Sequence, residues 1–171
     1  ASPEARAARL EGNPVREDLE EAAALCGVDF LVNVVLSEHK EIVYAAAGDV
    51  TAAHRDACRV LERLYRKPIP RPADIVVVSQ GGAPKDMNLY QLQKALDNAS
   101  HAVRPGGVIV LVGSCPEGFG EAVFARWMRE AASPEAILQR IGREFCIGGH
   151  KAGAFAKVLA KAGSVLVSDM A

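Results

Sequence analysis

The sequence predicts an α/β fold, in which a parallel, three-layer α/β sheet domain follows a helix, a β-hairpin and a second helix. Three observations support this prediction. The apolar runs 75–79 and 108–112 are continuous rather than alternating, which is typical of parallel strands covered on both faces. A helical pattern lies between them and completes a βαβ unit. The β-rich runs 30–36 and 41–47 flank the polar stretch Ser37–Lys40, as in a hairpin.

Composition limits the class of protein. At 171 residues, of which 50% are hydrophobic, the chain is long enough to bury a core. The 20 basic and 21 acidic residues give a net charge of −1. The protein therefore has no strong positive electrostatic field that would favour nucleic acid or an anionic membrane as a partner. No stretch approaches the ~20 apolar residues of a membrane span, and residues 1–9 lack the apolar core of a signal peptide. The cysteines lack zinc-ligand spacing, so we expect reduced thiols in a cytoplasmic protein.

Residues 1–70 are expected to form the end of an N-terminal domain. Asn13 and Pro14 mark the start of a helix, because Asn caps free amides and Pro is tolerated in the first turn, and Gly27 ends it. Residues 49–66 form a second, amphipathic helix after the hairpin. The first helix is predicted to bury an apolar stripe of Val15, Leu19, Ala22, Ala23 and Cys26.

The prolines of Lys67–Pro72 predict an extended connector, and we place a domain boundary there. Residues 71–171 then form a C-terminal α/β domain, which we expect to be truncated because the chain begins without Met and stops just after an apolar run. The predicted elements are a strand at 75–79, a helix at 89–103, a turn at 104–107, a strand at 108–112, helices starting near 121, 133 and 150, and a strand at 165–167.

A glycine-rich loop leads from the first strand of this domain into its first helix. Gly81 and Gly82 permit positive φ and a close approach of the backbone to a small ligand. Tyr90, Gln91 and Lys94 lie off the apolar stripe of the helix, so a phenol, an amide and an ammonium group share one patch. The patch is next to the positive end of the helix, which favours an anion. The alternative is an ordinary solvated helix face.

The loop 113–120 follows the next strand and is expected to line the same crevice. Phe119 stands where a P-loop would have lysine, so nucleotide phosphate binding has little support. We interpret Glu117 as a helix cap and Cys115 as an inert thiol. The histidines are scattered, and His150-Lys151 is interpreted as an ordinary helix start.

The stretch from residue 77 to 95, Val-Val-Ser-Gln-Gly-Gly-Ala-Pro-Lys-Asp-Met-Asn-Leu-Tyr-Gln-Leu-Gln-Lys-Ala, resembles the most distinctive motif of the nickel-dependent lactate racemase (LarA-like) family. Further segments resemble the same family in the same order. They are residues 10–18, 33–36, 47–49, 53–55, 104–107, 150–152 and 167–169.

The resemblance implies a racemase or epimerase of 2-hydroxy acids. Such an enzyme would invert the configuration of the α-carbon of its substrate by hydride transfer to and from a nickel pincer nucleotide, nickel pyridinium-3,5-bisthiocarboxylic acid mononucleotide. Lys94 would bind the substrate carboxylate, and Tyr90 and Gln91 would line the substrate site beside the glycine loop. The catalytic, cofactor-tethering and nickel-binding residues would precede Ala1, in the remaining N-terminal domain. We therefore expect no catalytic residue or metal ligand in this chain, no bound cofactor, and no activity of the chain alone. Ala83 stands where some members of the family carry an aromatic residue in the glycine loop, so the identity of the 2-hydroxy acid stays open.

Two other functions remain open. Residues 102–111 resemble a strand approach found in S-adenosylmethionine enzymes, which would make this a cofactor- or nucleotide-binding domain, although the glycine-rich loop after the first strand of those enzymes is missing. The second alternative is a non-catalytic module whose polar faces contact a partner domain.

Overall fold

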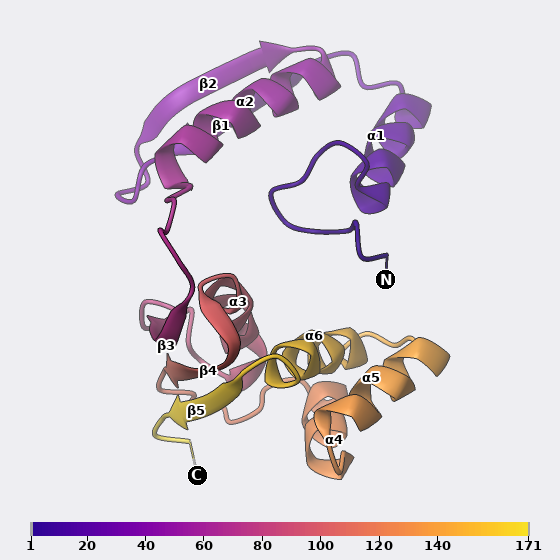
Figure 1. Ribbon diagram of the computed structural model, residues 1–171. Coiled ribbons are helices and arrows are strands. Elements are labelled where there is room, and N and C mark those ends of the chain that lie inside the picture. Colours follow the sequence, from indigo (N-terminus) through magenta and orange to yellow (C-terminus); the bar gives the residue numbers. More distant parts are fainter. Residues whose placement is uncertain (1, 171) are drawn as a thin grey trace. The chain divides into compact units, whose positions relative to one another are not determined.

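A computed structural model describes residues 2–170 of the chain. The chain divides into two compact units, Ala1–Pro68 and Ile69–Ala171 (Figure 1). The division lies inside the proline-rich segment Lys67–Pro72, where prolines keep the backbone extended.

The first unit contains the predicted helix, hairpin and helix. Its elements are α1 (Pro14–Cys26), β1 (Leu31–Leu36), β2 (Ile42–Gly48) and α2 (Val50–Tyr65). The Asn13 side chain accepts hydrogen bonds from the backbone N–H groups of Val15 and Arg16, and Gly27 ends the helix with a φ of 64°. β1 and β2 pair antiparallel, and α2 packs on them through a small core of Val35, Ala46, Ala53 and Ala57.

The predicted buried stripe of α1 is wrong. In α1, which the structure describes in full, no side chain is buried, and Val15 and Leu19 are 55% and 56% exposed. Polar contacts join this helix to α2, since Glu20 accepts hydrogen bonds from both Arg16 and Arg55, and these bonds lower the pKa of the Glu20 carboxyl. An apolar stripe is buried only where another element lies against it, and within this unit none covers α1.

The second unit is built around a parallel sheet, which confirms the predicted α/β class. Its elements are β3 (Ala73–Ser79), α3 (Leu89–Ser100), β4 (Val103–Val112), α4 (Ala122–Glu130), α5 (Pro134–Arg143), α6 (Gly149–Leu159) and β5 (Gly163–Val167). The strand order is β3-β4-β5, with β4 parallel to both neighbours. Ile75 pairs with Val108, and Val108 in turn pairs with Gly163.

The helix predicted at 89–103 is too long. α3 ends at Ser100, and Val103 begins β4, where it pairs with Ala73. The sequence 104–107, expected as a turn, is an irregular part of that strand, and the register shifts between Ala73 and Ile75. Val103 is nevertheless buried, at 1% exposed. The apolar side chain of Val103 can be buried equally well at the end of a helix or at the start of a strand. Periodicity alone therefore did not distinguish the two kinds of secondary structure.

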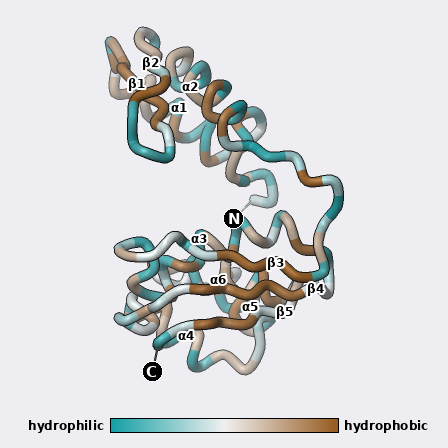
Figure 2. The backbone as a smooth tube through the Cα atoms, turned by 90° about the vertical axis from the view of Figure 1, so that its left-hand side faces the viewer, coloured by the Kyte–Doolittle hydropathy of each residue, from teal (hydrophilic) through white to brown (hydrophobic). Residues whose placement is uncertain are grey.

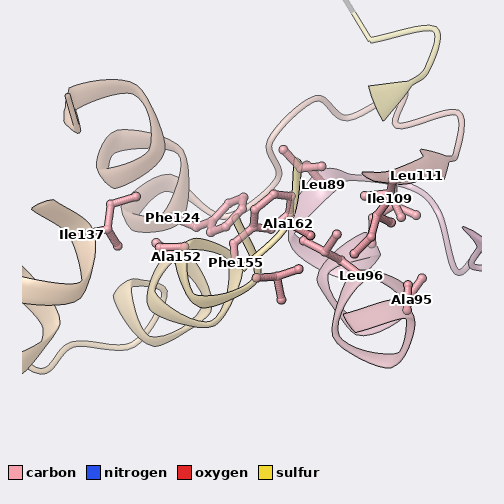
Figure 3. Close-up of a cluster of buried hydrophobic side chains, with 14 of the residues drawn as sticks. Leu89, Ala95, Leu96, Ile109, Leu111, Phe124, Ile137, Ala152, Phe155 and Ala162 are labelled. Carbon is pink, nitrogen blue, oxygen red and sulfur yellow. The ribbon is translucent and has the colours of Figure 1, made fainter. Parts of the chain in front are cut away.

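All four helices of this unit belong to one packed body. α3 contacts β3 and β4, α6 packs against α3, and α4 and α5 pack against α6. The core between them contains Leu96, Ile109, Leu111, Phe124 and Phe155 (Figure 3).

The other face of the sheet is open, which corrects the expectation that its strands are covered on both faces. Ile75 and Val77 are 63% and 70% exposed, and Val165 and Val167 are 51% exposed. Figure 2 shows the apolar character of the three strands. Within residues 69–170 the helices supply one covering layer, so the third layer of the predicted arrangement is not present in this part of the chain.

Among the residues that the structure describes, no helix combines the length and the apolar character needed to cross a membrane.

Candidate functional site

The glycine loop joins the carboxyl end of β3 to the start of α3. Gly81 and Gly82 have φ values of 92° and 75°. Residues with a side chain are strained at such positive φ values, whereas glycine is not. The backbone N–H of Gly81 donates to the hydroxyl of Ser79 at 3.2 Å. At the other end, the Asn88 side chain accepts from the backbone N–H of Gln91 at 3.0 Å and caps α3. The loop therefore has a defined shape at both ends.

Asp86 links this loop to the loop 113–120. Its buried carboxylate accepts a hydrogen bond from the backbone N–H of Ser114 at 3.1 Å, and its carbonyl accepts from that of Cys115 at 2.9 Å. Further along, the N–H groups of Leu89 and Tyr90 donate to carbonyl groups of the second loop. Hydrogen bonds therefore hold the two loops side by side, and both fix the first turn of α3. That the loops line one crevice stays a prediction.

Asp86 was not predicted as a site-forming residue. In sequence it is one acidic residue in a polar loop, and its partner is 28 positions away. The one available signal is that a carboxylate between two loops at the same sheet edge is a suitable acceptor for their free N–H groups.

We expect Asp86→Ala to destabilise the protein by about 1–3 kcal/mol, because the Ser114 N–H loses its acceptor in a half-buried place. Urea unfolding measures this change. Asp86→Asn is the matched control, since its amide oxygen keeps an acceptor at the same position, and it should lose clearly less stability. Equal losses in the two variants would contradict this role for the carboxylate.

Glu117 is not the helix cap that the sequence suggested. Glu121 caps α4 by accepting from the N–H groups of Val123 and Phe124, which lowers the pKa of its carboxyl. Glu117 instead accepts from the Asn88 side-chain amide at 2.7 Å. It thereby adds another link between the two loops. Cys115 is buried, and burial raises the pKa of its thiol, which fits an inert thiol.

The predicted patch lies on the first two turns of α3. Tyr90 is half-buried, and its ring meets the buried ring of Phe124 edge-on, with centroids 5.7 Å apart. Lys94 is exposed and donates to Gln91 Oε1 at 3.0 Å. Since an ammonium only donates, this bond fixes the Gln91 amide with its oxygen toward Lys94 and leaves its NH₂ group as a donor. Tyr90 precedes Lys94 by one turn.

Lys151 lies beside this patch, although from the sequence it was interpreted as part of an ordinary helix start. Its ammonium donates to Gln93 Oε1 at 2.7 Å and lies 5.5 Å from the centroid of the Tyr90 ring. Burial, and then the charge of Lys94, lower the pKa of Lys151. The available signal was a lysine at a helix start, where the dipole disfavours a cation. Its hydrogen-bond partner Gln93 is 58 residues away in sequence, which no local pattern reveals.

His150, next to Lys151, accepts a hydrogen bond from the backbone N–H of Gly148 through Nδ1. In the neutral ring, Nε2 therefore carries the proton. The Gly148 φ is 88°, and an added Cβ would collide with the Glu121 carboxylate, so this turn requires glycine. The other histidines lie outside the patch, and His54 is half-buried with a pKa that burial lowers.

Two cavities lie away from these residues. One, of about 380 Å³, is lined by side chains of α2 and by Pro68. The other, of about 300 Å³, lies between α4 and α5 and includes Trp127 and Arg140. Among residues 2–170, no group of three or more His, Cys, Asp or Glu side chains is placed to hold a metal ion. The patch on α3 is an open surface that presents donors.

The second unit is thus an α/β domain that presents a phenol, amides and ammonium groups at the carboxyl edge of a parallel sheet, a combination typical of proteins that bind small anions. Residues 69–171 match the family model described as the lactate racemase C-terminal domain. The chain therefore belongs to the lactate racemase family, which confirms the resemblance of its motifs.

Two curated relatives are named lactate racemase. The one from Thermoanaerobacterium thermosaccharolyticum is 33% identical over 172 aligned residues, which cover 98% of this chain and 40% of the relative. The one from Lactiplantibacillus plantarum is 33% identical over 139 residues, or 81% of this chain and 32% of the relative. The chain thus spans less than half the length of the relatives it matches.

Solved structures agree. The lactate racemase apoprotein from Thermoanaerobacterium thermosaccharolyticum has a TM-score of 0.90 and 32% identity, over 98% of this chain and 41% of that chain. A protein from Thermotoga maritima, 17% identical over 93% of this chain and 44% of that one, has a TM-score of 0.65 and supports the fold alone.

Proposed function

We propose that this chain is part of a 2-hydroxy-acid racemase or epimerase of the lactate racemase type, and that the patch on α3 binds the substrate. The observation that carries the proposal is the placement of Tyr90, Gln91 and Lys94 on one face of the first turns of α3, in a chain of the lactate racemase family. We assign residues 1–70 to the end of an N-terminal domain and residues 71–171 to a C-terminal substrate-binding domain.

The chemistry of the patch suits a carboxylate. Lys94 supplies a positive charge, and the Gln91 amide, oriented by its bond to Lys94, presents N–H donors. Tyr90 is held against Phe124 in the core, so its position does not depend on solvent-exposed contacts. Gly81 and Gly82 carry no side chain that would block the approach of a ligand to the loop backbone. These groups bind and orient the 2-hydroxy acid.

The nickel pincer nucleotide that the resemblance implies stays a prediction. Residues 2–170 do not contain a cluster of side chains placed to hold a metal ion. The described part of the chain therefore does not fit the metal, and its own residues contribute binding and orientation of the substrate. The curated relatives are longer than this chain, which supports a remaining N-terminal domain as the partner that would hold the cofactor and the catalytic histidines. Cytoplasmic localisation also stays a prediction.

A racemisation assay of the full-length protein tests this function. Single enantiomers of several 2-hydroxy acids, lactate among them, are incubated with the cofactor-loaded protein, and chiral chromatography follows the appearance of the opposite enantiomer. We expect inversion of at least one of them, and none with residues 1–171 alone. Absence of inversion together with tight calorimetric binding of S-adenosylmethionine would favour the alternative cofactor-binding domain.

A further inference from the structure

Lys151 places a second ammonium group beside the patch. It lies in the first turn of α6, which packs against α3, and its side chain is half-buried. The ammonium donates to Gln93 Oε1 at 2.7 Å and lies 5.5 Å from the centroid of the Tyr90 ring. This contact between α3 and α6 brings a charge from another element to the residues of the proposed substrate site.

The two lysines donate to glutamines that lie on opposite sides of Tyr90 around α3. Successive helix residues are rotated by about 100°, so Gln91 lies about 100° to one side of Tyr90 and Gln93 about 60° to the other. Lys94 donates to the oxygen of Gln91, and Lys151 donates to the oxygen of Gln93. Each glutamine therefore orients one ammonium, and the position of Tyr90 on α3 lies between the two glutamines.

The charges of the two lysines are not balanced by ion pairs. Within residues 2–170, neither ammonium has a carboxylate within ion-pairing distance. Burial of the Lys151 side chain and the charge of Lys94 both disfavour the charged form of Lys151, and the charge of Asp97 only partly offsets them. An anion between the ammonium groups would stabilise both charges. The Gln93 bond occupies one of the three donors of Lys151, which leaves others for a ligand.

We propose that Lys151 is a second substrate-binding cation, and that Lys94 and Lys151 bind the carboxylate of the 2-hydroxy acid from the two sides of Tyr90. This inference rests on the proposed function of the patch. The same contacts would also allow Lys151 to serve only as a tether between α3 and α6, so the test must separate charge from packing.

Four variants of the full-length protein make this separation. Lys151→Met keeps the length and the apolar stem but removes the charge, and Lys151→Arg keeps the charge. Lys157→Met is the matched control, because Lys157 is exposed on the same helix. Lys94→Met reports on the proposed function itself. Calorimetry gives the dissociation constant for lactate, racemisation kinetics give KM and kcat, and thermal unfolding gives the melting temperature.

We expect Lys151→Met to weaken lactate binding by about tenfold or more and to raise KM more than it lowers kcat. Lys151→Arg should recover most of the affinity, and Lys157→Met should match the unaltered protein. Unchanged affinity in Lys151→Met beside a loss in Lys94→Met would overturn the inference and leave the proposed function intact. Unchanged affinity in both would contradict the two together. Equal losses in Lys151→Met and Lys151→Arg, with lowered melting temperatures, would show a tether and would also overturn the inference.

Discussion

Lys94→Met in the full-length protein is expected to lower kcat/KM for its 2-hydroxy acid by roughly 10- to 150-fold. The reason is the loss of a charge-assisted hydrogen bond to the substrate carboxylate, which is worth about 1.5–3 kcal/mol. Methionine preserves the aliphatic stem, and Lys94 is exposed, so the fold should not change. Racemisation kinetics with single enantiomers measure this effect.

The pattern of the kinetic constants distinguishes binding from other roles. A residue that holds the carboxylate in both ground and transition states raises KM and changes kcat less. Lys157→Met controls for loss of a surface charge and should leave kcat/KM unchanged. If Lys94→Met kept both constants, the anchoring role of Lys94 would be wrong, and a surface that contacts a partner domain would become the better explanation of the patch.

Phe124→Ala is expected to have the largest effect on stability, a loss of about 3–5 kcal/mol. Phe124 is fully buried on α4, and its ring packs near those of Tyr90 and Phe119. It also lies beside the ring of Phe155 (Figure 3). Its removal leaves a cavity in the centre of the second unit and frees the inner edge of Tyr90. Urea unfolding measures the loss, and substrate affinity should fall with it because Tyr90 loses its support.

Phe145→Ala is the matched control for this substitution. Phe145 is 77% exposed in the segment before α6, so the same change of side chain should alter stability by no more than about 0.5 kcal/mol. Similar losses in Phe124→Ala and Phe145→Ala would contradict the assignment of Phe124 to the core that supports the site.

Local patterns predicted much of the fold. Asn13 with Pro14, and Gly27 after them, bounded α1 correctly because caps act through neighbouring backbone groups. The continuous apolar runs of β3 and β4 predicted parallel pairing, which the structure confirms. The same local patterns do not show which element covers an apolar surface. Val15 on α1 and Val77 on β3 are apolar as predicted, yet they are exposed in their units, because periodicity identifies a face and not its partner.

The site was predicted in the same partial way. Tyr90, Gln91 and Lys94 share a helix, so their spacing sufficed to place them on one patch. Asp86 and Lys151 form hydrogen bonds with residues far away in the chain, Ser114 and Gln93, and sequence spacing carries no signal for such contacts. Glu117 was assigned to the wrong role because Glu121, four residues later, is the acid that reaches the free N–H groups of α4.

A crystal structure of the full-length protein with bound lactate would show whether the patch on α3 binds the substrate. We expect a carboxylate oxygen at about 2.7–2.9 Å from Lys94 Nζ, the usual length of a charge-assisted hydrogen bond. We also expect the Gln91 amide and the Tyr90 hydroxyl beside the same ligand. Lactate bound with its carboxylate away from Lys94, on residues outside the first turns of α3, would show that the patch is not the substrate site.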